Sequence, residues 1–206
     1  MATNWPNSVQ TFTNPTAGSA LNSPSHADQH ATVNDTVEAL QQYAGLVFIK
    51  SQTIGSGVSS VTVTGAFSAT FDHYRVIVQI NTSSSSPYIG MTIGSSTSGY
   101  YGSRTATTYA GAFSGSGDNN ASKFSYLAAG YVGSPMQFSA DIRAPFIATE
   151  TQIFSSYVDS NATSGASAGT YSGFLNNSTS HSYFTIAPST GTITGGTIRV
   201  YGYNNG

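Results

Sequence analysis

The stretch YRVIVQIN (74–81) decides the fold class, because its apolar side chains recur at every second position. This period places them on one face of a β-strand. Working outward, similar short segments rich in Val, Ile, Thr, Tyr and Phe follow one another from Leu46 to Tyr203, with Gly, Ser and Asn between them. Ten further strands are predicted: 46–54, 59–67, 88–94, 105–113, 123–132, 136–144, 151–158, 169–175, 182–187 and 197–203.

These eleven short segments have no helix between them that is long enough for a parallel crossover, which indicates antiparallel pairing. We therefore predict a mainly β protein in which residues 46–206 form an antiparallel β-sandwich or a jelly-roll-like domain. The segments 82–87, 95–103 and 160–169 are rich in Ser, Gly or both, and we expect them to be exposed loops of this domain.

A short α-helix is predicted before the strands. Residues 26–44, HADQHATVNDTVEALQQYA, contain the good helix formers Ala, Glu, Leu and Gln, and Gly45 is suited to end the helix. Two starts are open. Asn34 could be the N-cap of a short helix, or a longer helix could begin near Ser25.

The longer helix would carry an apolar seam. Its members would follow one another at alternating spacings of four and three residues, as in a coiled coil. They are His26, His30, Val33, Val37, Leu40 and Ala44. The seam is too short to hold chains together unaided, but it could align chains that are joined elsewhere. We predict that Val33, Val37, Leu40 and Ala44 line the contact between the chains of an oligomer.

Residues 1–25 hold four of the seven prolines and show no sustained period, so we expect an extended arm. The predicted organisation is therefore an N-terminal anchoring arm and helix at 1–45, followed by a β body at 46–206. The first ten residues show neither the basic nor the apolar segment of a secretory signal.

The composition excludes several classes of protein. Six Lys and Arg side chains, spread along the chain, cannot neutralise a run of phosphates, so we expect no nucleic-acid partner. No apolar run approaches the roughly 20 residues of a membrane-spanning helix, so we expect no membrane insertion. With no cysteine there are no disulfides or thiolate sites, and stability must come from packing or assembly.

We expect no enzyme and no cofactor. Gly165, Ser167 and Gly169 match the letters G-x-S-x-G of a nucleophile elbow, but no helix follows and no carboxylate occurs after Asp159. A hydrolase with two carboxylates would need a pair among five residues that nothing in the sequence brings together. They are Asp72, Asp118, Asp141, Glu150 and Asp159.

Two charged or polar groups have simple structural interpretations. Asp141 and Arg143 would share one face of a strand and form a surface ion pair. Asp118, Asn119 and Asn120 offer oxygen atoms to Ca²⁺, but three adjacent residues without further spaced carboxylates are more typical of a loop turn.

Metal binding by the helix is a further alternative. His26 and His30 would lie on one helix face, and a three-fold assembly would bring six imidazoles together. Because one chain supplies only two ligands, we predict packed or solvated histidines and no metal.

Three tyrosines could contact a ligand. Tyr100 and Tyr101 lie in a predicted Gly- and Ser-rich loop, and Tyr88 follows another. Rigid amphipathic rings in such places are suited to contact sugars or protein partners, although they also serve to anchor loops or fill a core. A receptor- or carbohydrate-binding module that uses these loops is therefore an alternative function.

The segment TFTNPTAGSALNSPSHADQHATVNDTVEALQ (11–41) resembles the N-terminal segment of many tailed-bacteriophage virion proteins. There, P-T-x-G-x-x-L-N-S-P-S-H leads through a Gln-His pair into an N-D-x-V-E-A-L helix. The resemblance is carried by Pro15, Gly18, Leu21 to His26, Gln29, His30 and Asn34 to Leu40. The segments 54–76 and 196–203 are also similar to the β-rich modules of such proteins.

The resemblance implies a structural component of the virion, assembled in the cytoplasm of the bacterial host. Family members include tail fibres, minor tail proteins and head-attached appendages that decorate the capsid, so head and tail locations both stay open. Together with the seam, it leads us to expect a homotrimer that docks on other virion proteins through residues 1–45. In the alternative function, the exposed body binds a host-surface glycan during attachment.

Overall fold

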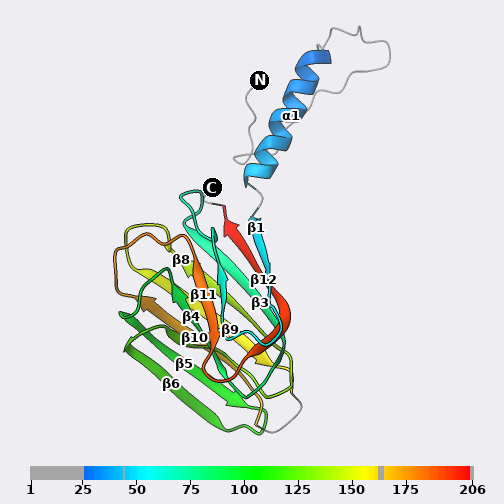
Figure 1. Ribbon diagram of the computed structural model, residues 1–206. Coiled ribbons are helices and arrows are strands. Elements are labelled where there is room, and N and C mark those ends of the chain that lie inside the picture. Colours follow the sequence, from blue (N-terminus) through cyan, green and yellow to red (C-terminus); the bar gives the residue numbers. More distant parts are fainter. Residues whose placement is uncertain (1–25, 44, 162–164, 205–206) are drawn as a thin grey trace. The chain divides into compact units, whose positions relative to one another are not determined.

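Figure 1 shows the computed structural model of the protein, which describes residues 26–43, 45–161 and 165–204. The predicted arm, residues 1–25, and the predicted seam residue Ala44 lie outside the described residues, as does the side chain of His26. Two compact units are distinguished, with their boundary between Gly45 and Leu46, and each is described by itself.

Helix α1 (His26–Tyr43) begins at the earlier of the two predicted starts. The alternative prediction of a short helix capped by Asn34 is wrong, because Asn34 lies within the helix. Extending an existing helix adds one hydrogen bond for each residue that is ordered, so a weak former such as Asn does not stop it. The Thr32 and Thr36 hydroxyls donate to the carbonyls of Asp28 and Thr32, each at 2.8 Å, and so find acceptors inside the helix.

The β body is a sandwich of two antiparallel sheets, which confirms the predicted fold class (Figure 1). The larger sheet has eight strands in the order β1-β12-β3-β8-β9-β10-β5-β6, and the smaller has four in the order β2-β11-β4-β7. The strands are β1 (Leu46–Thr53), β2 (Val61–Val63), β3 (His73–Ser83), β4 (Tyr88–Ile93), β5 (Tyr100–Thr108), β6 (Phe113–Ala121), β7 (Phe124–Ala129), β8 (Met136–Arg143), β9 (Thr151–Asp159), β10 (Ser167–Leu175), β11 (Phe184–Pro188) and β12 (Ile193–Tyr203).

Two local predictions are wrong. Strand β6 occupies a segment expected to be a loop turn, so Asp118, Asn119 and Asn120 lie in a strand. Strand β5 begins at Tyr100 rather than at Thr105, and therefore includes the last four residues of the predicted loop 95–103. In both places small polar residues pair through their backbones with a neighbouring strand, a contribution that side-chain periodicity does not reveal.

The core lies between the two sheets and follows the predicted period of two. Tyr74, Val76, Val78 and Ile80 of β3 are all fully buried. The Phe67 and Tyr74 rings meet edge to face, with their centroids 4.8 Å apart. Burying apolar surface stabilises the fold by about 25 cal/mol for each Å², so this inner face carries most of the stability.

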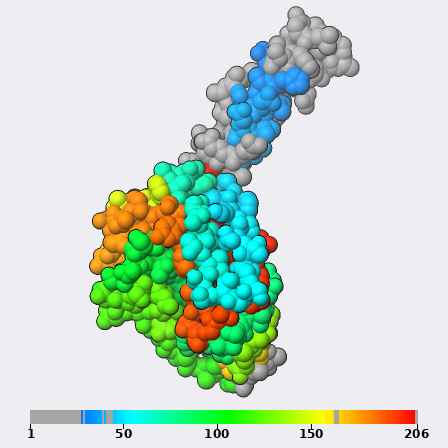
Figure 2. All heavy atoms as spheres, viewed as in Figure 1, coloured from blue at the N-terminus to red at the C-terminus, as the bar shows by residue number. Residues whose placement is uncertain are grey.

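Segments that are distant in sequence meet at the surface of the sandwich. Figure 2 shows cyan atoms, from the first part of the body, beside red-orange atoms from its last part. One contact of this kind is the isolated bridge between Val58 and Ile193. The face of the eight-stranded sheet opposite the core is not covered by the smaller sheet, and its side chains alternate with the core residues.

Candidate functional site

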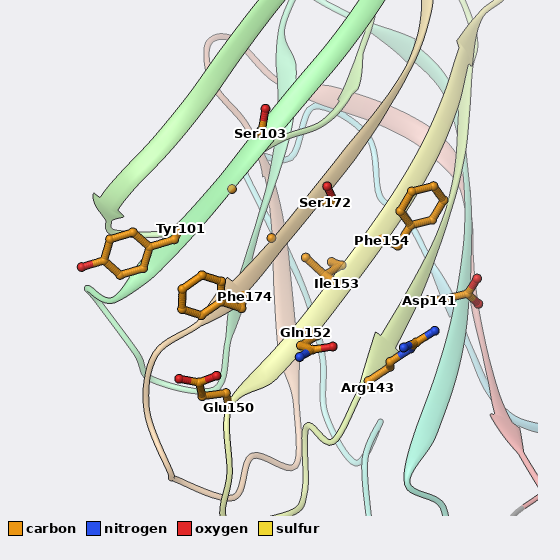
Figure 3. A pocket seen from close by; sticks show the side chains of 12 residues that line it. Tyr101, Ser103, Asp141, Arg143, Glu150, Gln152, Ile153, Phe154, Ser172 and Phe174 are labelled. Carbon is orange, nitrogen blue, oxygen red and sulfur yellow. The ribbon is translucent and has the colours of Figure 1, made fainter.

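A groove of about 590 Å³ lies on this outer face, over the neighbouring strands β5, β10, β9 and β8 (Figure 3). Its exposed lining side chains on β8 and β9 alternate with buried Ile142 and Ile153, as the pleat of a strand requires. The lining residues are Tyr101, Gly102, Ser103, Asp141, Arg143, Glu150, Gln152, Ile153, Phe154, Ser172, Gly173 and Phe174.

Strand register arranges most of these side chains in two rows across the sheet. The first row is Tyr101, Phe174, Gln152 and Arg143, and the second is Ser103, Ser172, Phe154 and Asp141. Each row takes one residue from each of four strands. The site therefore combines positions that are far apart in the sequence.

An aromatic pair forms one end of the first row. The rings of Tyr101 and Phe174 are nearly parallel, with 14° between their planes and 5.2 Å between their centroids. In Figure 3 they lie side by side, with their faces turned toward the viewer. Phe174 is 36% exposed and Phe154, in the second row, is 52% exposed. These rings present apolar surface to solvent beside polar groups, as ligand sites commonly do.

Two glycines allow the strands beneath the aromatic pair to pack closely. Gly102 and Gly173 are opposite one another in β5 and β10. A Cβ at Gly102 would lie 2.0 Å from the Tyr171 hydroxyl oxygen, and one at Gly173 would lie 2.4 Å from the Tyr101 carbonyl oxygen. The Tyr171 hydroxyl donates to Asp118 Oδ2 at 2.8 Å, and burial, followed by this hydrogen bond, raises the pKa of Tyr171. The phenol therefore stays protonated and supports the floor of the groove.

Asp141, at the other end of the second row, is held by two partners. The Arg75 guanidinium donates from Nε and Nη2 to its two carboxylate oxygens at 2.9 and 2.8 Å, and Tyr203 donates from Oη to Oδ1 at 2.7 Å. The hydrogen bond to Asp141 raises the pKa of Arg75. The predicted pair with Arg143 is wrong, because Arg75 lies directly opposite Asp141 on β3 and reaches both carboxylate oxygens.

The remaining polar side chains of the groove are available to a ligand. All are exposed, and within the described part of the chain none makes a side-chain hydrogen bond or ion pair. They are Ser103, Arg143, Glu150, Gln152 and Ser172. The groove thus offers hydroxyl, amide, carboxylate and guanidinium groups around exposed aromatic rings.

Only one of the three predicted ligand tyrosines lines the groove. Tyr101 does so, whereas Tyr100, the next residue along β5, points to the core and is fully buried. Burial raises the pKa of Tyr100 to about 12, and its hydroxyl accepts a hydrogen bond from the Ile93 amide at 2.8 Å. A ligand-contact role for Tyr100 is therefore wrong.

Tyr88 lies in β4 of the smaller sheet, outside the groove lining. Its ring meets Tyr126 edge to face, with 5.0 Å between the centroids. The guanidinium carbon of buried Arg104 lies 5.1 Å from the centroid of the Tyr88 ring. These contacts give Tyr88 a packing role, so it does not join Tyr101 in one site.

The predicted seam residues of helix α1 are exposed. Val33, Val37 and Leu40 have exposed fractions of 46%, 47% and 46%. They lie at the predicted spacings of four and three on one side of the helix. The described residues thus leave an apolar stripe uncovered, and its role as a contact between chains stays a prediction.

The nucleophile-elbow letters fall at the start of a strand, with Gly165 in the turn before it and Ser167 and Gly169 in β10. Ser167 is buried in β10, and its hydroxyl lies 3.1 Å from the Tyr157 hydroxyl, in a pair where either oxygen could donate. A strand runs on from it where an elbow requires a helix. Its neighbours therefore do not present Ser167 as a nucleophile.

The five carboxylates considered for catalysis are divided among several surroundings. Asp141 and Glu150 line the groove. Asp118 accepts from Tyr171, Asp159 accepts from the Asn161 amide at 3.2 Å, and Asp72 offers its backbone carbonyl to the Ala144 amide at 2.7 Å. Within the described segments, no group of three or more His, Cys, Asp or Glu residues is placed to hold a metal ion.

Comparisons of the chain with protein-family models, with curated proteins and with solved structures found no match. In the described part of the chain, no helix is long and apolar enough to cross a membrane.

Proposed function

We propose that the protein is a structural component of a tailed-bacteriophage virion, a homotrimeric fibre or appendage. Residues 1–45 dock on other virion proteins, and the β body is exposed. The similarity of residues 11–41 to virion proteins supports this class of protein. The observation that carries the oligomer is the stripe of Val33, Val37 and Leu40, because an exposed apolar seam on a helix is stabilised when copies of the helix cover it.

The oligomer is tested by placing a charge in the seam of the full chain. Leu40→Glu introduces a carboxylate into the helix contact, so the mass measured by light scattering should fall from three copies toward one copy of 21.3 kDa. Ala31→Glu, which adds the same charge at an exposed position off the seam, is the matched control and should leave the mass unchanged. An unchanged mass for Leu40→Glu would contradict the seam.

The location in the virion is tested by labelling the protein in phage particles and imaging them. A label on the head indicates an appendage that decorates the capsid, and a label on the tail indicates a fibre or minor tail protein. Absence of the label from purified particles would contradict a virion protein.

A second candidate function is carbohydrate binding during attachment to the host. The observation that favours it is the groove, where the parallel rings of Tyr101 and Phe174 lie beside polar side chains without partners in the described chain. The apolar face of a sugar ring can cover an aromatic ring, while its hydroxyls need both donors and acceptors.

This function is tested by binding of the full chain to host cells and isolated surface glycans. Tyr101→Ala removes one ring of the aromatic pair, and loss of such a contact commonly costs about 2 kcal/mol, so binding should weaken roughly 30-fold. Phe113→Ala is the control, because Phe113 is the most exposed large apolar residue described and lies outside the groove lining. Equal binding by both variants would contradict a glycan site in the groove.

A further inference from the structure

We infer that the groove takes an acidic oligosaccharide in one fixed direction, and this rests on the carbohydrate function proposed above. A neutral sugar ring covers Tyr101 and Phe174. A sugar that carries a carboxylate lies beside Arg143 and Phe154.

The groove has two separate aromatic surfaces, which suit consecutive sugar rings. Phe154 pairs in register with Ser172, while Phe174 pairs with Gln152, so the two phenylalanines are diagonal neighbours. Such neighbours are roughly 7–8 Å apart across a sheet. In Figure 3 the Phe154 ring lies well apart from the Tyr101–Phe174 pair. One flat ring cannot cover both surfaces, whereas a chain of two or more rings can.

Between these surfaces the side chains suit hydroxyl groups. Gln152 lies between Phe174 and Arg143 in the first row, and Ser172 adjoins Phe154 in the second. An amide and a hydroxyl both donate and accept hydrogen bonds, as a sugar hydroxyl does. Neither side chain has a hydrogen-bond partner within the described residues, so a ligand displaces only water from them.

The two ends of the groove differ in charge. At the Phe154 end, Asp141 is neutralised by Arg75, which leaves the positive charge of Arg143 uncompensated by any ion pair in the described chain. A planar guanidinium binds a carboxylate with two parallel hydrogen bonds. This end therefore favours an acidic sugar.

At the other end, which holds the Tyr101–Phe174 pair, Glu150 lies near Phe174 (Figure 3). Its carboxylate accepts hydrogen bonds from sugar hydroxyls and repels a second carboxylate. A chain with one acidic and one neutral sugar is consequently accepted in only one of its two directions.

The main competing occupant is a second copy of the chain, since exposed phenylalanines also occur at contacts between protein subunits. Such a contact would have to supply partners for five polar side chains of the groove at once, because burying them unpaired is costly. A ligand rich in hydroxyls supplies them directly, so we favour the sugar. The oligomer mass of each groove variant distinguishes the two.

The inference is tested with the full chain on an array of oligosaccharides that contain uronic or sialic acids, printed beside their carboxyl-reduced counterparts. Acidic forms should bind at least about tenfold more tightly. Arg143→Gln should remove this preference, so that acidic and reduced forms bind equally. Arg199→Gln removes the same charge at an exposed position outside the groove lining, so it is the matched control and should retain the preference. Phe154→Ala should weaken binding of tetrasaccharides more than binding of neutral disaccharides.

The outcomes separate the inference from the function on which it rests. If no oligosaccharide binds, or if Tyr101→Ala and Phe174→Ala leave binding unchanged, the carbohydrate function and the acidic-ligand inference both fail. If those variants abolish binding but reduced and acidic forms bind equally, only the acidic ligand and its direction fail. A lower oligomer mass for Phe154→Ala by light scattering would overturn both in favour of a contact between chains. Circular dichroism of each variant establishes that it is folded.

Discussion

Arg75 and Asp141 determine how charge is distributed along the outer face of the larger sheet. Their two hydrogen bonds occupy both carboxylate oxygens, and Asp141 forms no ion pair with Arg143 of its own strand in the described structure. The pair is partly exposed, with side-chain exposed fractions of 37% and 29%, so solvent screens much of its energy. The main effect of the Arg75–Asp141 pair is therefore to hold the Asp141 carboxylate beside Arg75, and not to stabilise the fold.

Replacing Asp141 tests this role. Asp141→Asn should lower the free energy of unfolding by only about 1 kcal/mol, measured by urea denaturation, because the pair is partly solvated. It also leaves Arg75 without its counter-charge and should raise the affinity of the groove for anionic ligands. If Asp141→Asn lowers the free energy of unfolding by more than roughly 4 kcal/mol, the pair stabilises the fold as strongly as a buried ion pair, which would contradict this role.

His181 predicts a dependence of stability on pH. It is buried, its Nε2 lies 3.3 Å from Asn177 Oδ1, and burial lowers its pKa below the ordinary value of 6.5. The unfolded chain therefore binds a proton at a higher pH than the folded chain does. The stability from neutral His181 is fully present above about pH 6.5 and is lost as pH falls below it.

Urea midpoints at about pH 7.5 and pH 5.5 measure this effect. The wild type should be less stable at the lower pH, and His181→Gln should reduce the difference between the two urea midpoints. Burial raises the pKa of Asp159, so this carboxyl contributes a dependence of the opposite sign. If the two urea midpoints differ as much in His181→Gln as in the wild type, groups other than His181 cause the pH dependence of stability.

At the scale of elements, periodicity predicts the strands that contribute to the core but not the strand that pairs at an edge. The apolar alternation of β3 is visible in the sequence and corresponds to its buried face. Strand β6 has one large apolar residue, Phe113, and its other positions are small or polar. It is held mainly by backbone pairing with β5, which leaves no periodic signal in the side chains.

Of the residues predicted to contact a ligand, only Tyr101 lines the groove, for a related reason. Tyr101 could be selected because it is an aromatic residue in a polar segment. Phe154, Gln152 and Arg143 could be assigned to strand faces by alternation, but their meeting with Tyr101 depends on the order β5-β10-β9-β8. Strand order comes from long-range pairing, which local pattern does not contain. A search for aromatic residues on the solvent face of each predicted strand would have found Phe154 and Phe174.

The glycine pair of β5 and β10 gives a prediction about these elements. Gly102→Ala places a Cβ 2.0 Å from the Tyr171 hydroxyl and should destabilise the fold by about 1–3 kcal/mol, measured by urea denaturation. Gly115→Ala is the matched control on β6, where the nearest atom to the new Cβ is 3.6 Å away, and should change stability by less than about 0.5 kcal/mol. Equal effects would contradict the close packing beneath the groove.

At the scale of the whole molecule, the described hydrophobic core lies in the β body. Every member of this buried cluster falls between Ile54 and Val200. The helix presents its apolar stripe to solvent, while the sheets bury theirs against each other. In the proposed oligomer, stability of the body and association of chains would therefore be carried by different parts of the sequence.

Removing residues 1–45 tests this division. The remaining body should keep the melting temperature of the full chain at equal monomer concentration, because it loses no core residue. Its mass by light scattering should correspond to a single copy. A trimer that persists after the removal would show that the sheets themselves associate.

Because side chains alternate between the two faces of a strand, residues on the outer face can change while the core residues stay the same. The positions of the two rows face solvent, whereas Ile142 and Ile153, which lie between the rows on β8 and β9, belong to the core. A descendant lineage can exchange the side chains of Ser103, Arg143, Gln152, Phe154 and Ser172 while its scaffold persists. In the proposed carbohydrate-binding function, such exchanges would change which glycans are bound with little loss of stability.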